Sequence, residues 1–296
     1  MRGKKPESEW PKKPVRRVDN GREHISIPFT WNLPAVRSQI ISGQLFGARP
    51  IVGGPAVRLM PEYLADVAEI GDTLPGVLQR VHKKATRTTV GCPNACGFCA
   101  VPIIEGEFRE LDDWLDLPII CDNNLLAATR RHFDKVVDRL KKHKGVDFNQ
   151  GLDAFRLSAS HASRLAELDG IFRLAWDNVN HEPAVHRAYQ HLRGAGIPPS
   201  RIRCYALFGY NDTPDDALYR IQTLVDWGVL PNPMRFTPIN GTSRKYVGAN
   251  WTEKELSKMH RWGSIGYLLD SIPFAEFDNR IRKRIKEQLS FDLAFG

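Results

Sequence analysis

The feature that most constrains the fold is an alternation, beyond Lys84, of short apolar runs with longer amphipathic segments. Six runs have the length and the β-branched or aromatic content of buried strands. They read ATRTTV, LPIIC, GVDFN, IFRLAW, RIRCYALF and NPMRFTPI. Strands that alternate with helices form parallel sheets, so the pattern predicts an α/β fold with a barrel or partial barrel of six strand–helix units.

The segments between these runs carry clear helix signals. Apolar residues at spacings of three and four predict a helix over residues 126–140, which is followed by KKHK and Gly145. A hydroxyl at the cap and a proline at the first position predict a second helix that begins at Thr213 and ends at Gly228. The pair Thr252 and Glu255 has the spacing of a capping box and predicts a third helix.

The rest of the chain divides around this region. Residues 1–23 are basic and interrupted by proline, which predicts a flexible tail. Residues 24–86 predict a small α/β extension: a strand in HISIPFTW, a helix in LPAVRSQIISGQLFG, a strand in ARPIVGG and a helix in PAVRLMPEYLADVAEIG. The barrel then covers residues 87–240, and a helical extension covers residues 241–296.

Composition limits the class of protein. The 296 residues are 42% hydrophobic, with no apolar run near the length of a membrane span. The first residues are basic and lack an apolar core, so we do not expect a secretory signal. We expect a cytoplasmic protein without a membrane partner. The net charge of +8 is partly concentrated at the two ends and permits contact with nucleic acid, although many soluble enzymes are as basic.

Three of the five cysteines lie within eight residues, in TTVGCPNACGFCAVP, directly after the first predicted barrel strand. Their spacing is Cys92-x3-Cys96-x2-Cys99. Thiolates suit zinc, Cu(I) or iron–sulfur clusters. A structural zinc site needs four ligands, and here Cys121 or His82 would have to supply the fourth. A redox pair would leave Cys92 without a role. Three cysteines also suit a [4Fe–4S] cluster whose fourth iron is open to a small molecule.

The cysteine spacing, the aromatic Phe98 before the last cysteine and the position after the first strand resemble the radical S-adenosylmethionine (SAM) superfamily. GCPNAC and CAVP are similar in particular to the branch that holds the methylthiotransferases and the cobalamin-domain enzymes. The resemblance covers about residues 85–240. It implies a partial (β/α)6 TIM-like barrel and a cluster on Cys92, Cys96 and Cys99. It also implies cleavage of SAM to a 5′-deoxyadenosyl radical, which abstracts hydrogen from a substrate, with flavodoxin or ferredoxin as the external electron donor.

The same resemblance assigns cofactor contacts to polar residues at successive strand ends. Phe98 would shield the cofactor, and the residues after the second strand would bind the SAM amino group. Those after the third would bind the ribose hydroxyls and the carboxylate, and an acidic position follows the fourth. The candidates are Asp122, Asn123, Asn124, Asn149, Gln150, Asp153 and Asp177. Each has a structural alternative, such as helix capping by Asp122 or Asn123.

Departures from the family limit the activity. Only Cys121 and Cys204 remain beside the motif, so a second all-cysteine cluster is excluded. VGGPAVRLMPEYL resembles the end of a cobalamin-binding domain, but the chain has no Asp-x-His-x-x-Gly sequence. The leading hypothesis is a radical SAM enzyme acting on an unidentified substrate, with a nucleobase or nucleotide as one candidate. The alternatives are a cobalamin- or SAM-dependent radical methyltransferase and a noncatalytic, zinc-stabilised nucleic-acid-binding protein.

Overall fold

The computed structural model describes residues 10, 12–43, 49–72, 76–265 and 272–277. The chain forms two compact units. The N-terminal unit comprises Met1–Leu152, Glu167–Gly170 and Thr237–Tyr246, and the C-terminal unit comprises Asp153–Ala166, Ile171–Phe236 and Val247–Gly296. The divisions that the sequence suggests at 86/87 and 240/241 stay predictions.

The N-terminal unit begins with a β-hairpin of β1 (Val15–Asp19) and β2 (Arg22–Ser26), paired antiparallel. Asn20 and Gly21 form the turn, with φ of 47° and 74°. Positive φ at both central residues is what a type I′ hairpin turn requires, and Asn-Gly is the sequence that favours it. The expected flexible tail over residues 1–23 is corrected here, because residues 15–23 belong to this hairpin.

A four-stranded sheet in the order β1-β2-β3-β4 extends the hairpin, with β3 (Ile51–Gly53) and β4 (Glu69–Ile70) added in parallel. Helix α1 (Leu33–Gly43) buries one apolar face. The buried side chains of this region form one apolar core. It includes Ile25, Leu33, Val36, Val52, Val57 and Leu64.

The expected helix over PAVRLMPEYLADVAEIG is wrong in its length. Helix α2 spans only Pro55–Leu59, a 3-10 turn follows at Pro61–Tyr63, and β4 occupies Glu69–Ile70. Pro61 has no N–H to donate and disfavours helical dihedrals at the residue before it. Met60 accordingly has φ −140° and ψ 62°.

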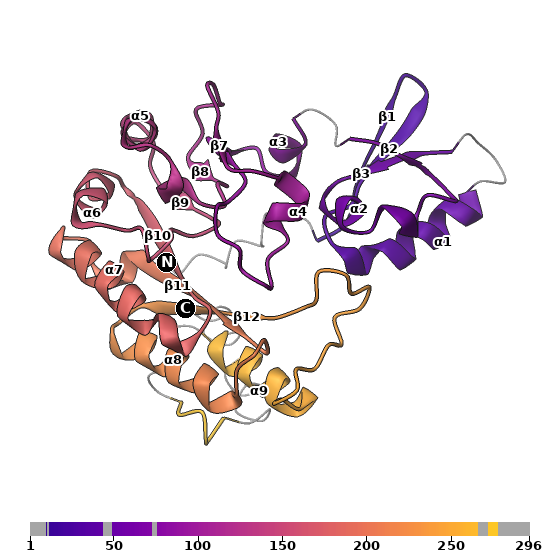
Figure 1. The fold of residues 1–296 in the computed structure, drawn as a ribbon. Helices are drawn as coiled ribbons and strands as arrows, with labels where there is room; N and C mark the ends of the chain where they lie inside the picture. Colours follow the sequence, from indigo (N-terminus) through magenta and orange to yellow (C-terminus); the bar gives the residue numbers. More distant parts are fainter. Residues whose placement is uncertain (1–9, 11, 44–48, 73–75, 266–271, 278–296) are drawn as a thin grey trace, which may run out of the picture. The chain divides into compact units, whose positions relative to one another are not determined.

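The main sheet has six strands in the order β5-β8-β9-β10-β11-β12. The strands from β8 to β12 are labelled in Figure 1. They are β5 (Ala85–Thr86), β8 (Ile119–Ile120), β9 (Val146–Phe148), β10 (Gly170–Trp176), β11 (Ile202–Phe208) and β12 (Leu230–Arg235). Pairing is parallel among β5, β8 and β9, and again among β10, β11 and β12. All six strands that the sequence predicted are therefore confirmed. The sheet is open, with β5 and β12 as its edge strands. The observed fold class is therefore α/β with a six-stranded parallel sheet, and the described residues do not show a barrel.

Helices follow these strands as predicted. Thr129 caps α5 (Arg130–Leu140), and reciprocal capping boxes begin α8 (Pro214–Asp226) and α9 (Glu253–Gly263) at Thr213 and Thr252. Helix α8 packs on β11 and β12 and also contacts α9. The remaining helices are α3 (Val77–Val81), α4 (Val101–Glu105), α6 (Ala159–Leu165) and α7 (Glu182–Gly194). Single 3-10 turns lie at Thr30–Asn32, Leu125–Ala127, Val179–His181 and Pro199–Arg201.

Candidate cofactor site at the cysteine loop

The three clustered cysteines lie in a loop whose ends are held together by a short antiparallel pair. Strand β6 (Thr89–Val90) pairs with β7 (Arg109–Glu110), and the Leu111 N–H donates to the Thr88 carbonyl at 2.9 Å. Residues 91–108 form the loop, and α4 lies inside it. Arg58 donates to the Ile104 carbonyl at 2.6 Å and so fixes α4 to α2, the helix that follows β3 of the four-stranded sheet. The loop is thus anchored at both ends and in its middle.

Gly91 is the residue that starts this loop, and no other residue fits there. Its φ is +80°. A Cβ would lie 2.6 Å from the Glu107 carbonyl oxygen and 2.9 Å from that of Gly106. The two ends of the loop therefore approach each other directly next to Cys92, where only glycine avoids a clash.

The three loop cysteines form no disulfide and are at least partly exposed, whereas Cys121 and Cys204 are buried. Burial raises the pKa of the Cys121 thiol to about 12 and also raises that of Cys204, so both stay protonated at neutral pH. The Cys99 N–H donates to the Cys96 carbonyl at 2.9 Å, which closes a tight turn between them. Their exposure therefore separates the loop cysteines from the two buried ones.

Cys92 already has two N–H groups beside its sulfur. The Asn94 backbone N–H and the Asn124 side-chain amide each lie 3.5 Å from Cys92 Sγ. Such N–H···S contacts stabilise a thiolate and tune the potential of an iron–sulfur cluster bound through it. Asn124, predicted at the end of the second strand, is thus next to the motif. Phe98 is half-buried in the same loop.

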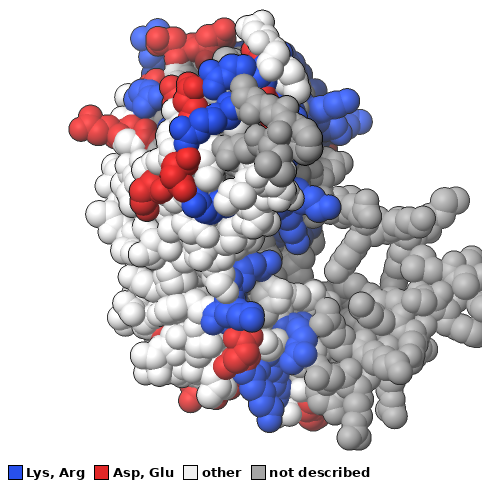
Figure 2. Space-filling view, turned by 90° about the vertical axis from the view of Figure 1, so that its right-hand side faces the viewer, with Lys and Arg blue, Asp and Glu red and all other residues white. Residues whose placement is uncertain are grey.

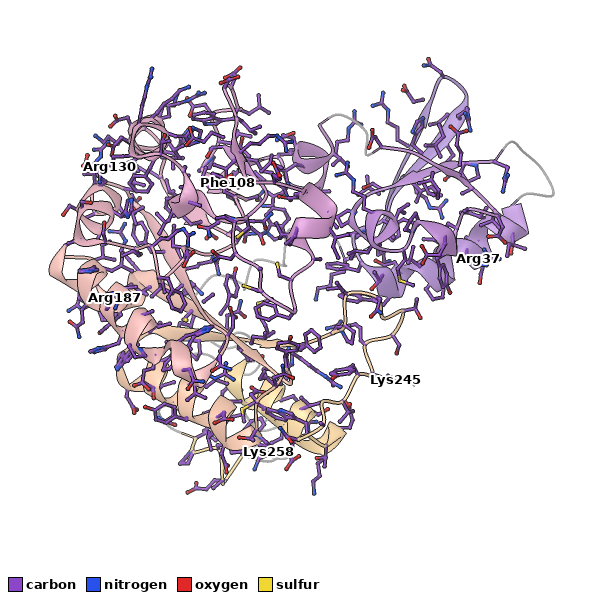
Figure 3. All side chains as sticks on the ribbon, viewed as in Figure 1. Arg37, Phe108, Arg130, Arg187, Lys245 and Lys258 are labelled. Atoms are coloured by element: carbon purple, nitrogen blue, oxygen red, sulfur yellow. The ribbon has the colours of Figure 1, made fainter. Side chains whose placement is uncertain are left out.

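No group of three His, Cys, Asp or Glu side chains is close enough to hold a metal in the part of the chain that the structure describes. Figure 3 shows sulfur atoms in yellow beside the loop that leads into α4. The donor set itself fits an iron–sulfur cluster, because three accessible thiols come from one loop and N–H donors already face one sulfur. His82, the alternative fourth zinc ligand, is buried, stacks on Trp10 with ring centroids 4.7 Å apart, and its Nδ1 accepts from the Lys84 N–H.

Asp122 accepts hydrogen bonds from Thr88, the residue before the strand that leads into the loop. Its Oδ1 accepts from the Thr88 backbone N–H at 2.6 Å and its Oδ2 accepts from the Thr88 hydroxyl. Burial raises the pKa of this carboxyl, and the hydrogen bonds from Thr88 oppose that shift. The expected helix-capping role is wrong, since Thr129 caps α5 and no side-chain cap begins the turn at Leu125. Both oxygens instead fix Thr88, the residue before β6.

His132 continues this buried network. Its Nε2 lies 3.2 Å from the Thr88 hydroxyl, and its Nδ1 lies 3.5 Å from the Glu110 carboxylate. Burial lowers the pKa of the imidazole, and the repulsion of Lys135 acts in the same direction, while Glu110 and Asp122 act against it. Its ring also lies beside Trp114, with centroids 5.1 Å apart. Neutral His132 is therefore the form that the fold prefers.

This preference gives a pH prediction. The folded-state pKa of His132 is below 6.5, so the unfolded chain takes up a proton that the folded chain does not as the pH falls below that value. The wild-type free energy of unfolding should lose a component between pH 6.5 and the folded-state pKa, and His132→Gln should lack this component. Urea unfolding at a series of pH values measures it. Parallel pH curves for the two proteins would contradict the prediction.

Asn149 and Gln150 follow β9 at the next strand end. The Asn149 N–H donates to the Ile120 carbonyl at 2.9 Å, and its side chain hydrogen-bonds the Cys121 thiol and lowers its pKa against the larger effect of burial. Gln150 is exposed. Asn149 is thus hydrogen-bonded within the sheet, whereas Gln150 is exposed just beyond the C-terminal end of β9.

Asp153 and Asp177 lie in the C-terminal unit. Asp153 organises a local turn: its carboxylate accepts from the Phe155 N–H at 3.0 Å and from Arg156 at 3.1 Å. Asp177 directly follows β10, and burial raises its pKa while His181 and Arg220 lower it. The two acids therefore differ, since Asp153 is committed to its own turn and Asp177 is a partly exposed carboxyl at a strand end.

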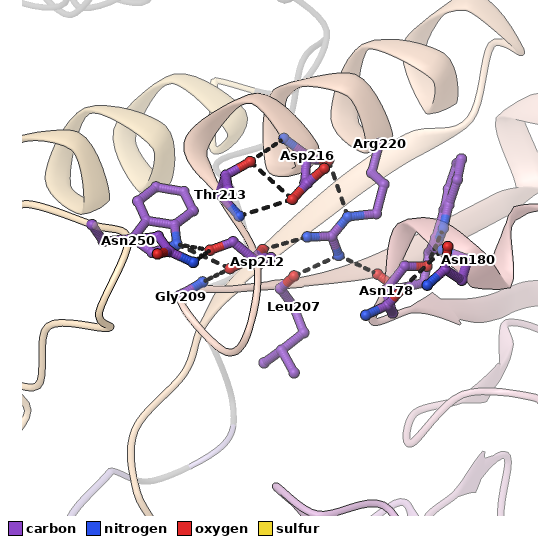
Figure 4. A network of polar contacts seen from close by, with 11 residues as sticks. Asn178, Asn180, Leu207, Gly209, Asp212, Thr213, Asp216, Arg220 and Asn250 are labelled. Atoms are coloured by element: carbon purple, nitrogen blue, oxygen red, sulfur yellow. Dashed lines mark hydrogen bonds and ion pairs between the residues drawn. The ribbon is translucent and has the colours of Figure 1, made fainter.

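Arg220 of α8 ties the ends of β10 and β11 together, as Figure 4 shows. Its guanidinium is fully buried and donates to the carbonyls of Trp176 and Leu207 and to the Asp212 carboxylate at 2.8, 2.6 and 2.5 Å. Asp212 also accepts from the Gly209 N–H and the Trp251 indole, each at 2.9 Å. This network could not be predicted from the sequence, because its partners come from four separate segments.

Three arginines of the described N-terminal segment form ion pairs. Arg16, Arg17 and Arg22 pair with Glu23, Asp19 and Glu69, respectively. Figure 2 shows a face on which Lys and Arg lie intermingled with Asp and Glu. The second basic cluster, Arg280 to Lys286, lies outside the described residues. A nucleic-acid surface therefore stays a prediction.

Among the described residues, no helix has the length and apolar content needed to cross a membrane. Comparisons with known proteins assign the chain to no family. No protein-family model matches the chain, and no curated protein matches it at a significant level.

Proposed function

We propose that this chain is a radical SAM enzyme in which Cys92, Cys96 and Cys99 hold a [4Fe–4S] cluster. The observation that carries the proposal is the loop itself. It provides three at least partly exposed cysteines after the first strand of a six-stranded parallel sheet, while the other two cysteines are buried. Three thiolates leave one iron without a protein ligand, and that iron is where SAM would bind.

The proposal includes a partial (β/α)6 barrel formed by this sheet. The cysteine loop follows β5 and β6, and Asn124, Asn149 and Asp177 follow β8, β9 and β10. In such barrels the carboxyl ends of the strands carry the active site. The order of these residues along the sheet supports the assignment.

When bound, the reduced cluster and SAM supply a 5′-deoxyadenosyl radical for hydrogen abstraction. The chain's own residues have simpler tasks. The Asn94 and Asn124 N–H groups stabilise the Cys92 thiolate. Asp122 holds the start of β6 through Thr88, and Asn123 is held by Glu105 at 2.7 Å. Gln150 is exposed and Asp177 is half-buried at their strand ends, and in this proposal Phe98 shields the site from water. The catalytic group that acts on the substrate is not assigned.

An electron donor of the flavodoxin or ferredoxin type and a reducing, cytoplasmic location complete the proposal. Exposed thiols such as Cys96 survive as metal ligands where glutathione and thioredoxin keep them reduced. The substrate is not assigned, and a nucleobase or nucleotide is one candidate.

The test is anaerobic reconstitution of the full chain with iron and sulfide, followed by reduction with dithionite in the presence of SAM. We expect about four irons per chain, a cluster EPR signal that SAM changes, and release of 5′-deoxyadenosine. Absence of SAM cleavage by the reduced, iron-loaded protein would overturn the proposal. The alternatives give other results: bound corrinoid in protein made with cobalamin indicates the methyltransferase, and zinc without iron or sulfide indicates the noncatalytic protein.

A further inference from the structure

Glu105, the last residue of α4, has a side chain that is only 7% exposed. Its Oε2 accepts from the Gly91 backbone N–H at 2.8 Å and from the Asn123 side-chain amide at 2.7 Å. Its Oε1 accepts from Arg87 Nη1 at 2.5 Å. One buried carboxylate thus binds three donors from three separate segments.

Each of these donors lies next to a functional element. Gly91 directly precedes Cys92, and Asn123 directly precedes Asn124, whose amide lies 3.5 Å from Cys92 Sγ. Arg87 follows β5, the first strand of the main sheet. Glu105 therefore links the start of the cysteine loop to the segment that follows β8. That segment places the Asn124 side-chain amide beside Cys92 Sγ.

The charges of the region make this carboxylate hard to replace. No Asp or Glu occurs between Asp72 and Glu105, so the loop contributes no other acid before α4 ends. Within the described residues, the Glu105 carboxylate is the one hydrogen-bond acceptor of the Arg87 guanidinium, which it contacts through Nη1. The buried Nε of Arg87 makes no hydrogen bond there. Charge-assisted hydrogen bonds of this kind are the strong ones, and removing the acceptor leaves buried donors unsatisfied.

We propose that Glu105 is a positioning residue, which fixes Gly91 and Asn123 so that Cys92 is presented to the cluster with the Asn124 amide beside its sulfur. The role toward the cluster rests on the proposed function, whereas the ordering of the loop does not need a metal. The two parts can therefore be tested separately.

The first test is amide hydrogen exchange of the metal-free protein. In Glu105→Gln, the side-chain amide puts N–H against N–H whichever way it turns, because every partner of Glu105 is a donor. We expect the Gly91 amide to exchange about tenfold faster than in the wild type. Glu107→Gln is the matched control, since it makes the same charge change on an exposed side chain of the same loop and should leave Gly91 exchange unchanged.

A double variant keeps the test independent of misfolding. In Arg87→Met with Glu105→Gln, the new amide can turn its oxygen toward Gly91 and Asn123 and its N–H₂ toward the vacated guanidinium position. Slow exchange at Gly91 should return to within about threefold of the wild type. Equal exchange in the wild type and Glu105→Gln, or no recovery in the double variant, would overturn the ordering role.

The second test measures the reconstituted protein. Hydrogen bonds to cluster sulfurs raise the reduction potential, so loosening Asn123 and Asn124 in Glu105→Gln should shift the midpoint potential to a more negative value and change the EPR line shape. Glu107→Gln should do neither. An unchanged potential in Glu105→Gln would overturn the role toward the cluster. A wild type that binds no cluster would overturn the proposed function instead, and the exchange result would still decide whether Glu105 orders the loop.

Discussion

Cys96→Ala is expected to abolish both cluster binding and SAM cleavage. Cys96 is the most exposed of the three loop thiols, and its backbone carbonyl accepts from the Cys99 N–H in the turn between them. Alanine keeps this backbone contact and removes only the sulfur, so the fold should persist. Iron per chain, the EPR signal and 5′-deoxyadenosine release are the measurements, and we expect all three to fall to background.

Cys204→Ala is the matched control for this experiment. Cys204 is fully buried in β11, and burial raises its pKa, so it should not act as a ligand. Its replacement should leave iron content and SAM cleavage at the wild-type level, at a cost of about 1 kcal/mol of stability for the lost contacts. Loss of the cluster in Cys204→Ala, or its retention in Cys96→Ala, would contradict the assignment of the ligands.

Arg220→Met should destabilise the protein by about 3–5 kcal/mol, the usual result of removing one partner from a buried ion pair. The variant leaves the Asp212 carboxylate uncompensated and deprives the Trp176 and Leu207 carbonyls of their donor. Urea unfolding measures the change. Arg187→Met on α7 removes the same charge from an exposed position and should cost less than about 0.5 kcal/mol.

A double variant separates the ion pair from simple packing. Adding Asp212→Asn to Arg220→Met removes the uncompensated charge, while an amide oxygen can still accept from Gly209 and Trp251. The double variant should therefore be destabilised by less than the sum of the two single changes. Additive effects, or a loss below about 1 kcal/mol in Arg220→Met, would show that the network contributes little.

The strands and the helix starts could be predicted because their signals are local. Each strand of the main sheet is a short apolar run, and the caps at Thr213 and Thr252 act within three residues of their own positions. The Asn20-Gly21 turn was an equally local signal, which was missed because the basic composition of the segment suggested a tail. The prediction of a helix through Pro61 did not take the proline into account, although the effect of a proline on its neighbours is also local.

The candidate site was predictable only in part. The cysteine spacing and the strand-end position of Asn124 are readable from the sequence, and the structure brings Asn124 to Cys92. Glu105 and the Thr88 network were not readable, because their partners are 14 to 44 residues away along the chain. The actual partners of Asp122 and Asp153 also depend on loop geometry that residue type does not reveal.

The pairing of β6 with β7 has a consequence for handling the protein. Residues 91–108 are already closed into a loop by backbone hydrogen bonds, so metal uptake does not have to bear the entropy of bringing distant ends together. A zinc finger, by contrast, unfolds without its metal. Under the proposed function, the chain should therefore stay folded when the cluster is lost in air, and reconstitution of the cluster should need no refolding step.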